Sequence, residues 1–260
     1  MKNKNDIVIL KNTYDGIARL TLNDENSSNS LSEEMMEALE DNIKTLSLDN
    51  TVKVIIIDAI GSIFSSGHNL KEITNARQND DKGETYFKNL FDQCSQLMQL
   101  IVNCPKPIIA EVDGIATAAG CQLVASCDLA ISSSEARFAT PGVNIGLFCS
   151  TPMVALSRNV KKKDAMKMLL TGDLIDACEA KRIGLINDFV SSDDLKTNVN
   201  NLANKIAKKP SLTIETGKKA FYRQHELDLA EAYNYTSQIM SENILDCLLY
   251  TSDAADETER

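Results

Sequence analysis

Two short segments rich in small residues each combine a turn with backbone N–H groups that could hold a ligand. The first is Phe64-Ser-Ser-Gly-His-Asn-Leu-Lys71, and the second is Asp113-Gly-Ile-Ala-Thr-Ala-Ala-Gly120. Small side chains let a ligand approach the backbone, and N–H groups at a helix start lack partners within the helix. Two such turns together could stabilise a negatively charged oxygen, as an oxyanion hole does. Tight packing between a strand and a helix is the alternative interpretation of either segment alone.

Each segment comes after an apolar stretch that predicts a strand, and helices and strands alternate along the chain. Strands are predicted at residues 7–11, 17–22, 52–59, 108–112, 129–131, 137–139 and 184–190. Helices are predicted from a cap at Ser30 to about residue 46, at 86–102, from the small residues at 116–120, at 151–157, 161–170 and 176–182, and from 194 onward. Residues 71–82 are polar and predict a loop. This order indicates an α/β fold.

Charge and composition exclude several classes of partner. The net charge is −10, from 37 acidic and 27 basic residues. This balance disfavours nucleic acid and anionic membranes as main partners. No apolar run is long enough for a membrane span, and the first residues resemble neither a signal peptide nor a presequence. We therefore expect a cytoplasmic protein with no membrane association.

The cysteines and histidines do not suggest a metal site. The seven cysteines are scattered through apolar contexts, and only His68 and His225 supply imidazoles. None of these residues has the spacing of metal ligands. We expect small buried thiols in a reducing compartment and no bound metal.

A series of motifs extends over roughly residues 17–240. They are Leu20-Thr-Leu-Asn, Asn29-Ser-Leu-Ser, Val54-Ile-Ile-Ile, the His68 turn, Lys106-Pro-Ile-Ile-Ala-Glu-Val-Asp-Gly, Ala118-Ala-Gly-Cys-Gln, Cys127-Asp-Leu-Ala, Phe138-Ala-Thr-Pro, Leu170-Thr-Gly-Asp-Leu-Ile-Asp-Ala and Ala180-Lys-Arg-Ile-Gly-Leu-Ile. In this order they resemble the enoyl-CoA hydratase/isomerase (crotonase) superfamily. The segments around residues 116–128 and 138–152 resemble one branch of it most closely.

The resemblance implies a crotonase-like spiral of ββα units with a C-terminal helical trimerisation region. The expected parts are a core domain at residues 1–193, a helical region at 194–246 and an atypical tail at 247–260, for which a non-native origin is one explanation. It also implies homotrimers or hexamers. The expected ligand is an acyl-CoA thioester, with no separate cofactor.

The resemblance also assigns roles to residues of both turns. The backbone N–H groups of His68 and Ala119 would hold the thioester oxygen, which acquires enolate character during the family's reactions. Asn69, Leu70 and Lys71 would lie along the nucleotide end. The other residues expected at the substrate are Ser66, Gly67, Gly120, Phe148 and Cys149.

The sequence departs from the family where hydration chemistry is done. Family hydratases carry two glutamates that position and split water; this chain has Gln122 and Gly142 at those positions. An amide cannot transfer a proton in the required pKa range, and glycine has no side chain to do so. The usual hydratase mechanism therefore does not transfer, although glutamates restored at both positions would be expected to raise hydration if the scaffold still positions water.

The remaining polar groups leave several functions open. His68 could act only through its backbone, with its ring in solvent, or its ring could titrate near neutrality and act on a carboxyl or carbonyl group. Asn144 either shapes its loop or assists catalysis, Thr140 lies nearby, and Cys149 has no adjacent base. The alternatives are an enoyl-CoA hydratase-like or isomerase-like enzyme that uses the oxyanion hole, a non-catalytic acyl-CoA-binding protein, and a decarboxylase-like enzyme that uses His68.

Overall fold

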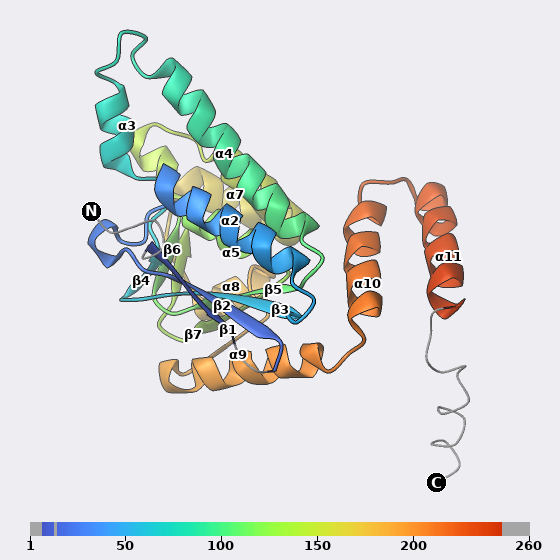
Figure 1. Ribbon diagram of the computed structural model, residues 1–260. Coiled ribbons are helices and arrows are strands. Elements are labelled where there is room, and N and C mark those ends of the chain that lie inside the picture. Colours follow the sequence, from blue (N-terminus) through green and yellow to red (C-terminus); the bar gives the residue numbers. More distant parts are fainter. Residues whose placement is uncertain (1–6, 13–14, 246–260) are drawn as a thin grey trace. The chain divides into compact units, whose positions relative to one another are not determined.

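The computed structural model describes residues 7–12 and 15–245 and divides into two compact units, Met1–Lys208 and Lys209–Arg260 (Figure 1). We had expected the core domain to end at residue 193. The first unit instead includes helix α9 (Ser192–Ala207), which packs on the large sheet. The atypical tail at 247–260 lies outside the described residues.

A six-stranded sheet forms the centre of the first unit. Its strands are β1 (Val8–Asn12), β2 (Ile17–Leu22), β3 (Val54–Ala59), β5 (Ile108–Val112), β7 (Leu129–Ser133) and β10 (Asp188–Val190), in the order β1-β2-β3-β5-β7-β10. Only β1 runs antiparallel to its neighbour. Buried residues on both faces explain why β3 and β5 are nearly continuous apolar runs.

A second, four-stranded sheet consists of strands so short that their sequences show little periodicity. The strands are β4 (Ile63–Ser65), β6 (Ile115–Thr117), β8 (Arg137–Ala139) and β9 (Ile175–Asp176). Strands β4, β6 and β8 are parallel neighbours, and β9 pairs antiparallel with β8. This sheet positions the candidate site described below.

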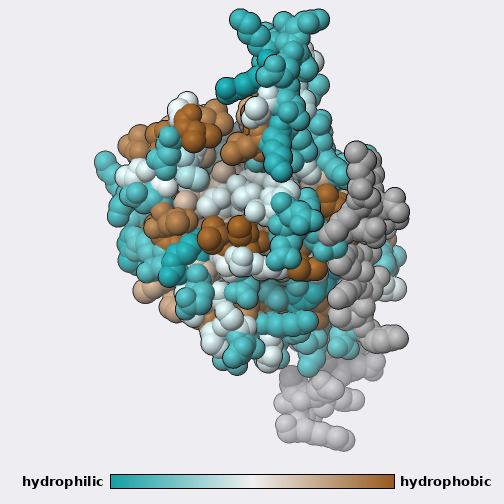
Figure 2. Space-filling model, turned by 90° about the vertical axis from the view of Figure 1, so that its left-hand side faces the viewer, coloured by the Kyte–Doolittle hydropathy of each residue, from teal (hydrophilic) through white to brown (hydrophobic). Residues whose placement is uncertain are grey.

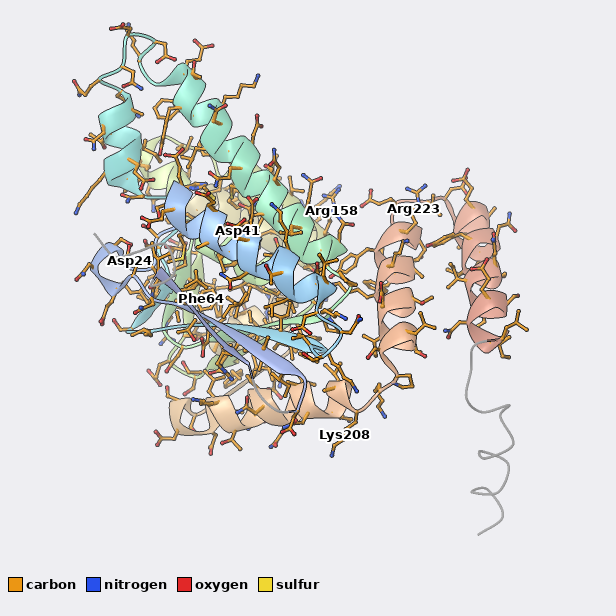
Figure 3. The ribbon with its side chains drawn as sticks, viewed as in Figure 1. Asp24, Asp41, Phe64, Arg158, Lys208 and Arg223 are labelled. Atoms are coloured by element: carbon orange, nitrogen blue, oxygen red, sulfur yellow. The ribbon has the colours of Figure 1, made fainter. Side chains whose placement is uncertain are left out.

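Helices cover both faces of the large sheet (Figure 1). The helices of the first unit are α2 (Glu33–Leu48), α3 (Leu70–Ala76), α4 (Glu84–Asn103), α5 (Ala119–Ser126), α6 (Ser150–Asn159), α7 (Lys162–Thr171), α8 (Ala177–Ile183) and α9, with short 3-10 turns η1 (Glu25–Ser27) and η2 (Pro141–Ile145). The larger core includes apolar residues of α2, α4 and α5, and the smaller core lies under α9. Phe64, labelled in Figure 3, is fully buried in the larger core.

A buried ionic cluster ties α9 to the sheet. The Arg19 guanidinium on β2 donates to Glu111 on β5 at 2.8 Å and to Asn200 on α9 at 3.0 Å, and it also pairs with Asp58 on β3. Removing one partner of such a buried network would leave a charge without compensation. The cluster gives a physical reason for α9 to belong to the first unit.

The second unit is described on its own as two antiparallel helices, α10 (Ser211–Gln224) and α11 (Leu229–Leu245). Both helices lie within residues 194–246, the region that we expected to be helical. Both helices expose large apolar side chains, among them Phe221, Tyr233 and Met240. No helix in the described part of the chain is both long and apolar enough to cross a membrane.

Several local predictions were wrong. Residues 71–82 are not a loop throughout, because α3 begins at Leu70 and is capped by the Asn69 side chain, which accepts from the Lys71 N–H at 3.0 Å. Helix α2 is capped by Ser32 rather than Ser30. The last strand is shorter than expected, and β4, β6 and β9 were not predicted. Short-range capping and short pairings are poorly encoded by hydrophobic periodicity.

Candidate active site

Three parallel strands of the small sheet end at the same edge. Strand β4 pairs with β6 through Ser65 and Ala116, and β6 pairs with β8 through Thr117 and Ala139. The residues that follow these strands therefore emerge side by side. They are Ser66-Gly67-His68, Ala118-Ala119 and Thr140-Pro141-Gly142. Ligands of parallel sheets commonly bind outside the carboxyl ends of the strands, and both segments singled out in the sequence are found there.

The two turns are in direct contact because glycine occupies the contact points. Gly67 has φ +88°, and a Cβ atom built on it would lie 2.8 Å from the Ala118 Cβ and 3.1 Å from the Ala119 nitrogen. A Cβ on Gly120 would lie 2.3 Å from the Ser65 carbonyl oxygen. A side chain at either glycine would push the two turns apart.

The start of α5 presents backbone N–H groups to this edge. Ala118 precedes the helix with φ 51° and ψ −120°, a strained conformation for alanine, and no side chain caps the helix. Among the described residues, we find no hydrogen-bond acceptor for the N–H of Ala119 or of His68. The structure thus brings together two backbone donors that the sequence placed far apart.

The His68 ring is turned toward the protein interior, so the interpretation of a ring in solvent was wrong. Its Nδ1 faces the Leu31 carbonyl oxygen at 3.3 Å, and the ring meets Phe91 edge-on with centroids 5.5 Å apart. An Nδ1 that faces a carbonyl carries the hydrogen, which leaves Nε2 as an acceptor; this Nε2 is buried and has no partner among the described residues. Burial lowers the pKa of His68 despite the Leu31 carbonyl. The ring is therefore neutral at neutral pH.

Gln122 lies on α5 and is almost completely buried. Its Oε1 accepts a long contact from the Cys94 thiol of α4 at 3.8 Å. Burial raises the pKa of Cys94 to about 12, so this thiol stays neutral. The Gln122 amide and the Cys94 thiol are thus both uncharged, and neither exchanges a proton near neutral pH.

Gly142 lies in a tight turn that leaves no room for a side chain. The Leu147 N–H donates to the Gly142 carbonyl at 2.9 Å, which folds the turn back on itself. A Cβ on Gly142 would lie 2.2 Å from the Leu147 carbonyl oxygen and 2.8 Å from the Cys149 Sγ. Backbone atoms therefore occupy the place of a side chain at residue 142, which does not favour the prediction that glutamates at both positions would raise hydration.

The same turn places the other predicted residues of this segment. Asn144 is exposed, and its amide nitrogen would lie 3.0 Å from a Cβ on Gly172, at the end of α7, which favours a loop-shaping role. Phe148 is partly exposed. Cys149 is buried, and burial raises the pKa of its thiol. A neutral thiol is a poor nucleophile.

Residues after the His68 turn lie on a mostly exposed helix. Leu70 and Lys71 are exposed at the start of α3. The Asn69 amide caps this helix and also donates to Glu72 Oε1 at 3.1 Å. Figure 2 shows a hydrophilic tip at the top, where α3 meets α4, and brown apolar areas below it. Exposed apolar residues of the first unit include Leu70, Ile145, Leu147 and Phe148.

The structure adds an acidic group that the sequence did not single out. Tyr86 on α4 donates its hydroxyl to Glu72 Oε2 at 3.3 Å, and Glu33 on α2 lies close enough to interact. Burial raises the pKa of Glu72, and repulsion from Glu33 adds to this shift. Burial, with Glu72 and Glu33 nearby, also raises the pKa of Tyr86.

The raised pKa of Glu72 makes a prediction for stability. The folded state binds a proton at Glu72 more tightly than the unfolded state, so stability from this group decreases as pH rises from its ordinary pKa of 4.5 through the raised value. The free energy of unfolding of Glu72→Gln, taken relative to that of the parent, should therefore be higher at about pH 8 than at about pH 5. The difference between the two pH values should be less than about 1 kcal/mol, because solvent screens the site. Urea unfolding at both pH values measures this; Asp92→Asn, an exposed carboxylate on α4, is the control. If the free energy of unfolding of Glu72→Gln differed from that of the parent by the same amount at both pH values, the prediction would be contradicted.

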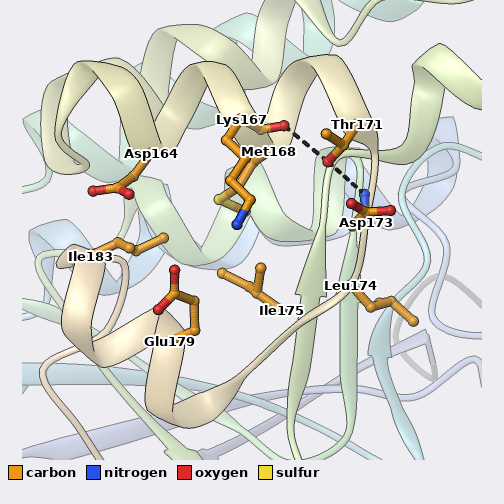
Figure 4. A pocket seen from close by; sticks show the side chains of 9 residues that line it. All are labelled: Asp164, Lys167, Met168, Thr171, Asp173, Leu174, Ile175, Glu179 and Ile183. Carbon is orange, nitrogen blue, oxygen red and sulfur yellow. Dashed lines mark hydrogen bonds between the residues drawn. The ribbon is translucent and has the colours of Figure 1, made fainter.

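A separate cavity lies between α7 and α8 (Figure 4). Its volume is about 440 Å³, and its lining includes Lys167, Met168 and Ile175. Arg182 binds both Asp164, at 2.9 Å, and Glu179 beside it. No residue of the three strand ends lines this cavity, so it is distinct from the site of the N–H groups. Within the described residues, no cluster of His, Cys, Asp or Glu could hold a metal ion.

A family model described as enoyl-CoA hydratase/isomerase matches residues 12–246. The chain belongs to this family. It is 48% identical over 229 residues to enoyl-CoA hydratase domain-containing protein 3, mitochondrial, of Xenopus laevis, which covers 88% of this chain and 76% of the relative. The human protein of that name is 46% identical over 230 residues, with 88% and 74% covered.

Solved structures of the family share the fold. A crystal structure of human enoyl Coenzyme A hydratase domain-containing protein 3 has a TM-score of 0.87 and 42% identity, and it covers 97% of this chain and 96% of that chain. An enoyl-CoA hydratase of Mycobacterium smegmatis has a TM-score of 0.91 and 41% identity, with 98% and 97% covered. The predicted crotonase-like α/β fold is confirmed. The name shared by the human and frog relatives is that of the family branch that the sequence segments around Ala119 and Phe138 resemble.

The names of the relatives bear on the expected compartment. The vertebrate relatives are called mitochondrial, whereas the sequence led us to expect a cytoplasmic location. The comparisons thus show the family and the fold, and the names of the vertebrate relatives do not match the compartment that we expected.

Proposed function

We propose that this family member binds acyl-CoA thioesters and holds the thioester carbonyl on the backbone N–H groups of His68 and Ala119. The observation that carries the proposal is the contact of the two turns at the ends of parallel strands, through Gly67. Two fixed donors stabilise the negative charge that grows on a thioester oxygen as it becomes an enolate. The acyl-CoA enters as substrate or ligand, and no separate cofactor is part of the proposal.

The proposed site polarises a thioester but lacks the means to hydrate an enoyl group by the two-glutamate route. Gln122 can hold water but cannot take up or release its proton, and the turn at Gly142 fills the second position with the Leu147 carbonyl. If the protein is an enzyme, we therefore propose that it acts through a thioester enolate without these carboxylates, as a weak hydratase or an isomerase.

A second candidate is acyl-CoA binding without catalysis. It is favoured by the closed turn at Gly142 and by the absence of a proton-transferring side chain at Gln122. A decarboxylase-like reaction that uses His68 as an acid has less support, since burial lowers the pKa of His68 and the neutral ring carries its hydrogen toward Leu31. Turnover of an acyl-CoA separates catalysis from binding alone.

The proposal includes assembly into homotrimers or hexamers. The support is the row of exposed apolar side chains on α10 and α11, which a second copy of the chain would cover. A monomeric mass in light scattering at micromolar concentration would contradict this assembly.

A pair of matched ligands tests the proposed carbonyl contact. Butyryl-CoA carries the thioester oxygen, whereas S-butyl-CoA is a thioether that lacks it. Calorimetric titration should give at least about tenfold tighter binding of butyryl-CoA, because only its oxygen satisfies the two donors. Equal affinity would show that the ligand does not use these N–H groups, and failure of both ligands to bind would refute the acyl-CoA proposal.

A further inference from the structure

Asn29 belongs to a sequence motif to which the proposed function gives no role. Its side chain is buried, and both polar atoms of its amide are bonded. The amide nitrogen donates to the Ile60 carbonyl at 2.9 Å and to the Ile63 carbonyl at 2.7 Å, and Oδ1 accepts from the Asp24 N–H at 2.8 Å. These bonds fasten residues 24–31 to the end of β3 and to the start of β4.

The backbone at Asn29 adopts a conformation that few residue types enter. Asn29 has φ 49° and Ser28 before it has φ 59°, so two successive residues lie in the left-handed region. Asparagine is one of the few residues other than glycine that populate this region readily. The Asn29 N–H also donates to the Asp24 carbonyl at 2.8 Å. The backbone and the side chain of one residue thus fix the shape of this segment.

The same segment is also bonded to the turn that carries the first proposed donor. The Ser66 N–H donates to the Ser28 carbonyl at 3.1 Å, and the Leu31 N–H donates to the Gly67 carbonyl at 2.7 Å. The Leu31 carbonyl in turn faces the His68 Nδ1 at 3.3 Å. These three bonds, here called the clamp, hold the turn against the segment.

The clamp helps to set where the His68 N–H lies relative to the Ala119 N–H. The close approach of Gly67 to Ala118 holds the turn from one direction. The clamp holds the same turn through residues 66–68, from a different part of the chain. A donor displaced by about 1 Å loses much of its effect on a developing negative charge. The residue that fixes the clamp therefore bears on the carbonyl contact.

We propose that Asn29 is a positioning residue for the thioester carbonyl, because it fixes the clamp that holds the His68 N–H in place. The inference rests on the proposed function, which supplies the carbonyl. Asn29 itself does not touch the ligand and acts through its neighbours Ser28 and Leu31. Loss of the amide therefore weakens the part of ligand binding that depends on the carbonyl oxygen and leaves the rest.

The test compares butyryl-CoA with S-butyl-CoA, which lacks the carbonyl, in the full chain and in Asn29→Gly and Asn29→Asp. Glycine keeps the left-handed backbone without the amide, and aspartate keeps the size and the acceptor without the two donors. The parent should bind butyryl-CoA at least about tenfold more tightly than S-butyl-CoA. Both variants should lower this ratio below about threefold, with S-butyl-CoA bound within about twofold of its affinity for the parent.

Asn187→Ala is the control for a loss of stability alone. The Asn187 Oδ1 accepts from the Ala130 N–H at 2.8 Å and ties β7 to the residue before β10, and neither residue belongs to the clamp. This variant should unfold at a lower temperature and keep the ratio of the parent. A ratio of about tenfold in a folded Asn29 variant would overturn the inference and leave the proposed function standing. Equal affinities in the parent would overturn both.

Hydrogen exchange in the parent tests the same link without a substitution. Saturating butyryl-CoA should slow amide exchange in residues 28–31 at least about threefold more than saturating S-butyl-CoA does, because a carbonyl bound to the His68 N–H steadies the turn that the clamp joins to them. Residues 187–190 should exchange equally with both ligands. Equal exchange of residues 28–31 with the two ligands would overturn the inference even if neither Asn29 variant folds.

Discussion

Hydration of crotonyl-CoA by the purified protein is expected to be at least about 10⁴-fold slower than by family members that carry both glutamates. General acid–base catalysis contributes about 10²–10⁴-fold for each group, and both groups are missing here. Gln122 offers only an amide beside the Cys94 thiol, and Gly142 offers no side chain. The loss of absorbance of the enoyl thioester measures the rate, with a glutamate-bearing hydratase assayed in parallel.

The double variant Gln122→Glu/Gly142→Glu provides the sharper form of this prediction. It should stay inactive and lose stability, because a Cβ at residue 142 would lie 2.2 Å from the Leu147 carbonyl oxygen. Gln122→Glu alone should fold but give little activity, since the acid and the base act as a unit. Hydration by the parent at the rate of the glutamate-bearing enzyme, or full rescue in the double variant, would show that our account of this turn is wrong.

Replacing Gly67 by alanine is expected to weaken butyryl-CoA binding about 100-fold. The new methyl group would lie 2.8 Å from the Ala118 Cβ and 3.1 Å from the Ala119 nitrogen, so the two turns must separate. Separation removes two hydrogen bonds to the thioester oxygen, each of which contributes about 1 to 1.5 kcal/mol. Calorimetric titration with butyryl-CoA and with S-butyl-CoA measures the loss and shows whether it depends on the carbonyl.

Gly146→Ala is the matched control for this substitution. Gly146 also has a positive φ, +78°, but a Cβ there would meet nothing within 4 Å. It should therefore carry the backbone strain of about 1 kcal/mol without disturbing the turns. Thermal unfolding of both variants separates strain from contact. A Gly67→Ala protein that folds and still discriminates butyryl-CoA from S-butyl-CoA would contradict the proposed carbonyl contact.

The sequence predicted the large sheet well because its strands carry a strong physical signal. Strand β2 was predicted with its observed bounds, and β5 is a buried apolar run that ends at Asp113-Gly114. The small sheet was largely missed, since β4 and β6 are three residues long and alternate too briefly to show a period. Yet this sheet explains why His68 and Ala119 lie close together, which the sequence indicated only through the family resemblance.

The surroundings of individual side chains were the second feature that could not be predicted from the sequence. Nothing in the sequence of residues 138–149 shows that the Leu147 carbonyl fills the space beside Gly142, because that contact depends on how the turn folds back. The inward orientation of His68 and the unpartnered hydroxyl of Thr140 are likewise products of packing between distant segments. The family resemblance placed Gly142 where hydratases carry a glutamate, but the consequence of this glycine for a rescue experiment required the structure.

The most direct test of the carbonyl contact is the infrared spectrum of a bound thioester. Butyryl-CoA labelled with ¹³C at the carbonyl gives an isotope-edited band whose frequency reports hydrogen bonding to that oxygen. Two backbone donors at His68 and Ala119 predict a band at lower frequency in the complex than in free butyryl-CoA, and a return toward the free frequency in Gly67→Ala. A band at the free frequency in a fully bound complex would contradict the account.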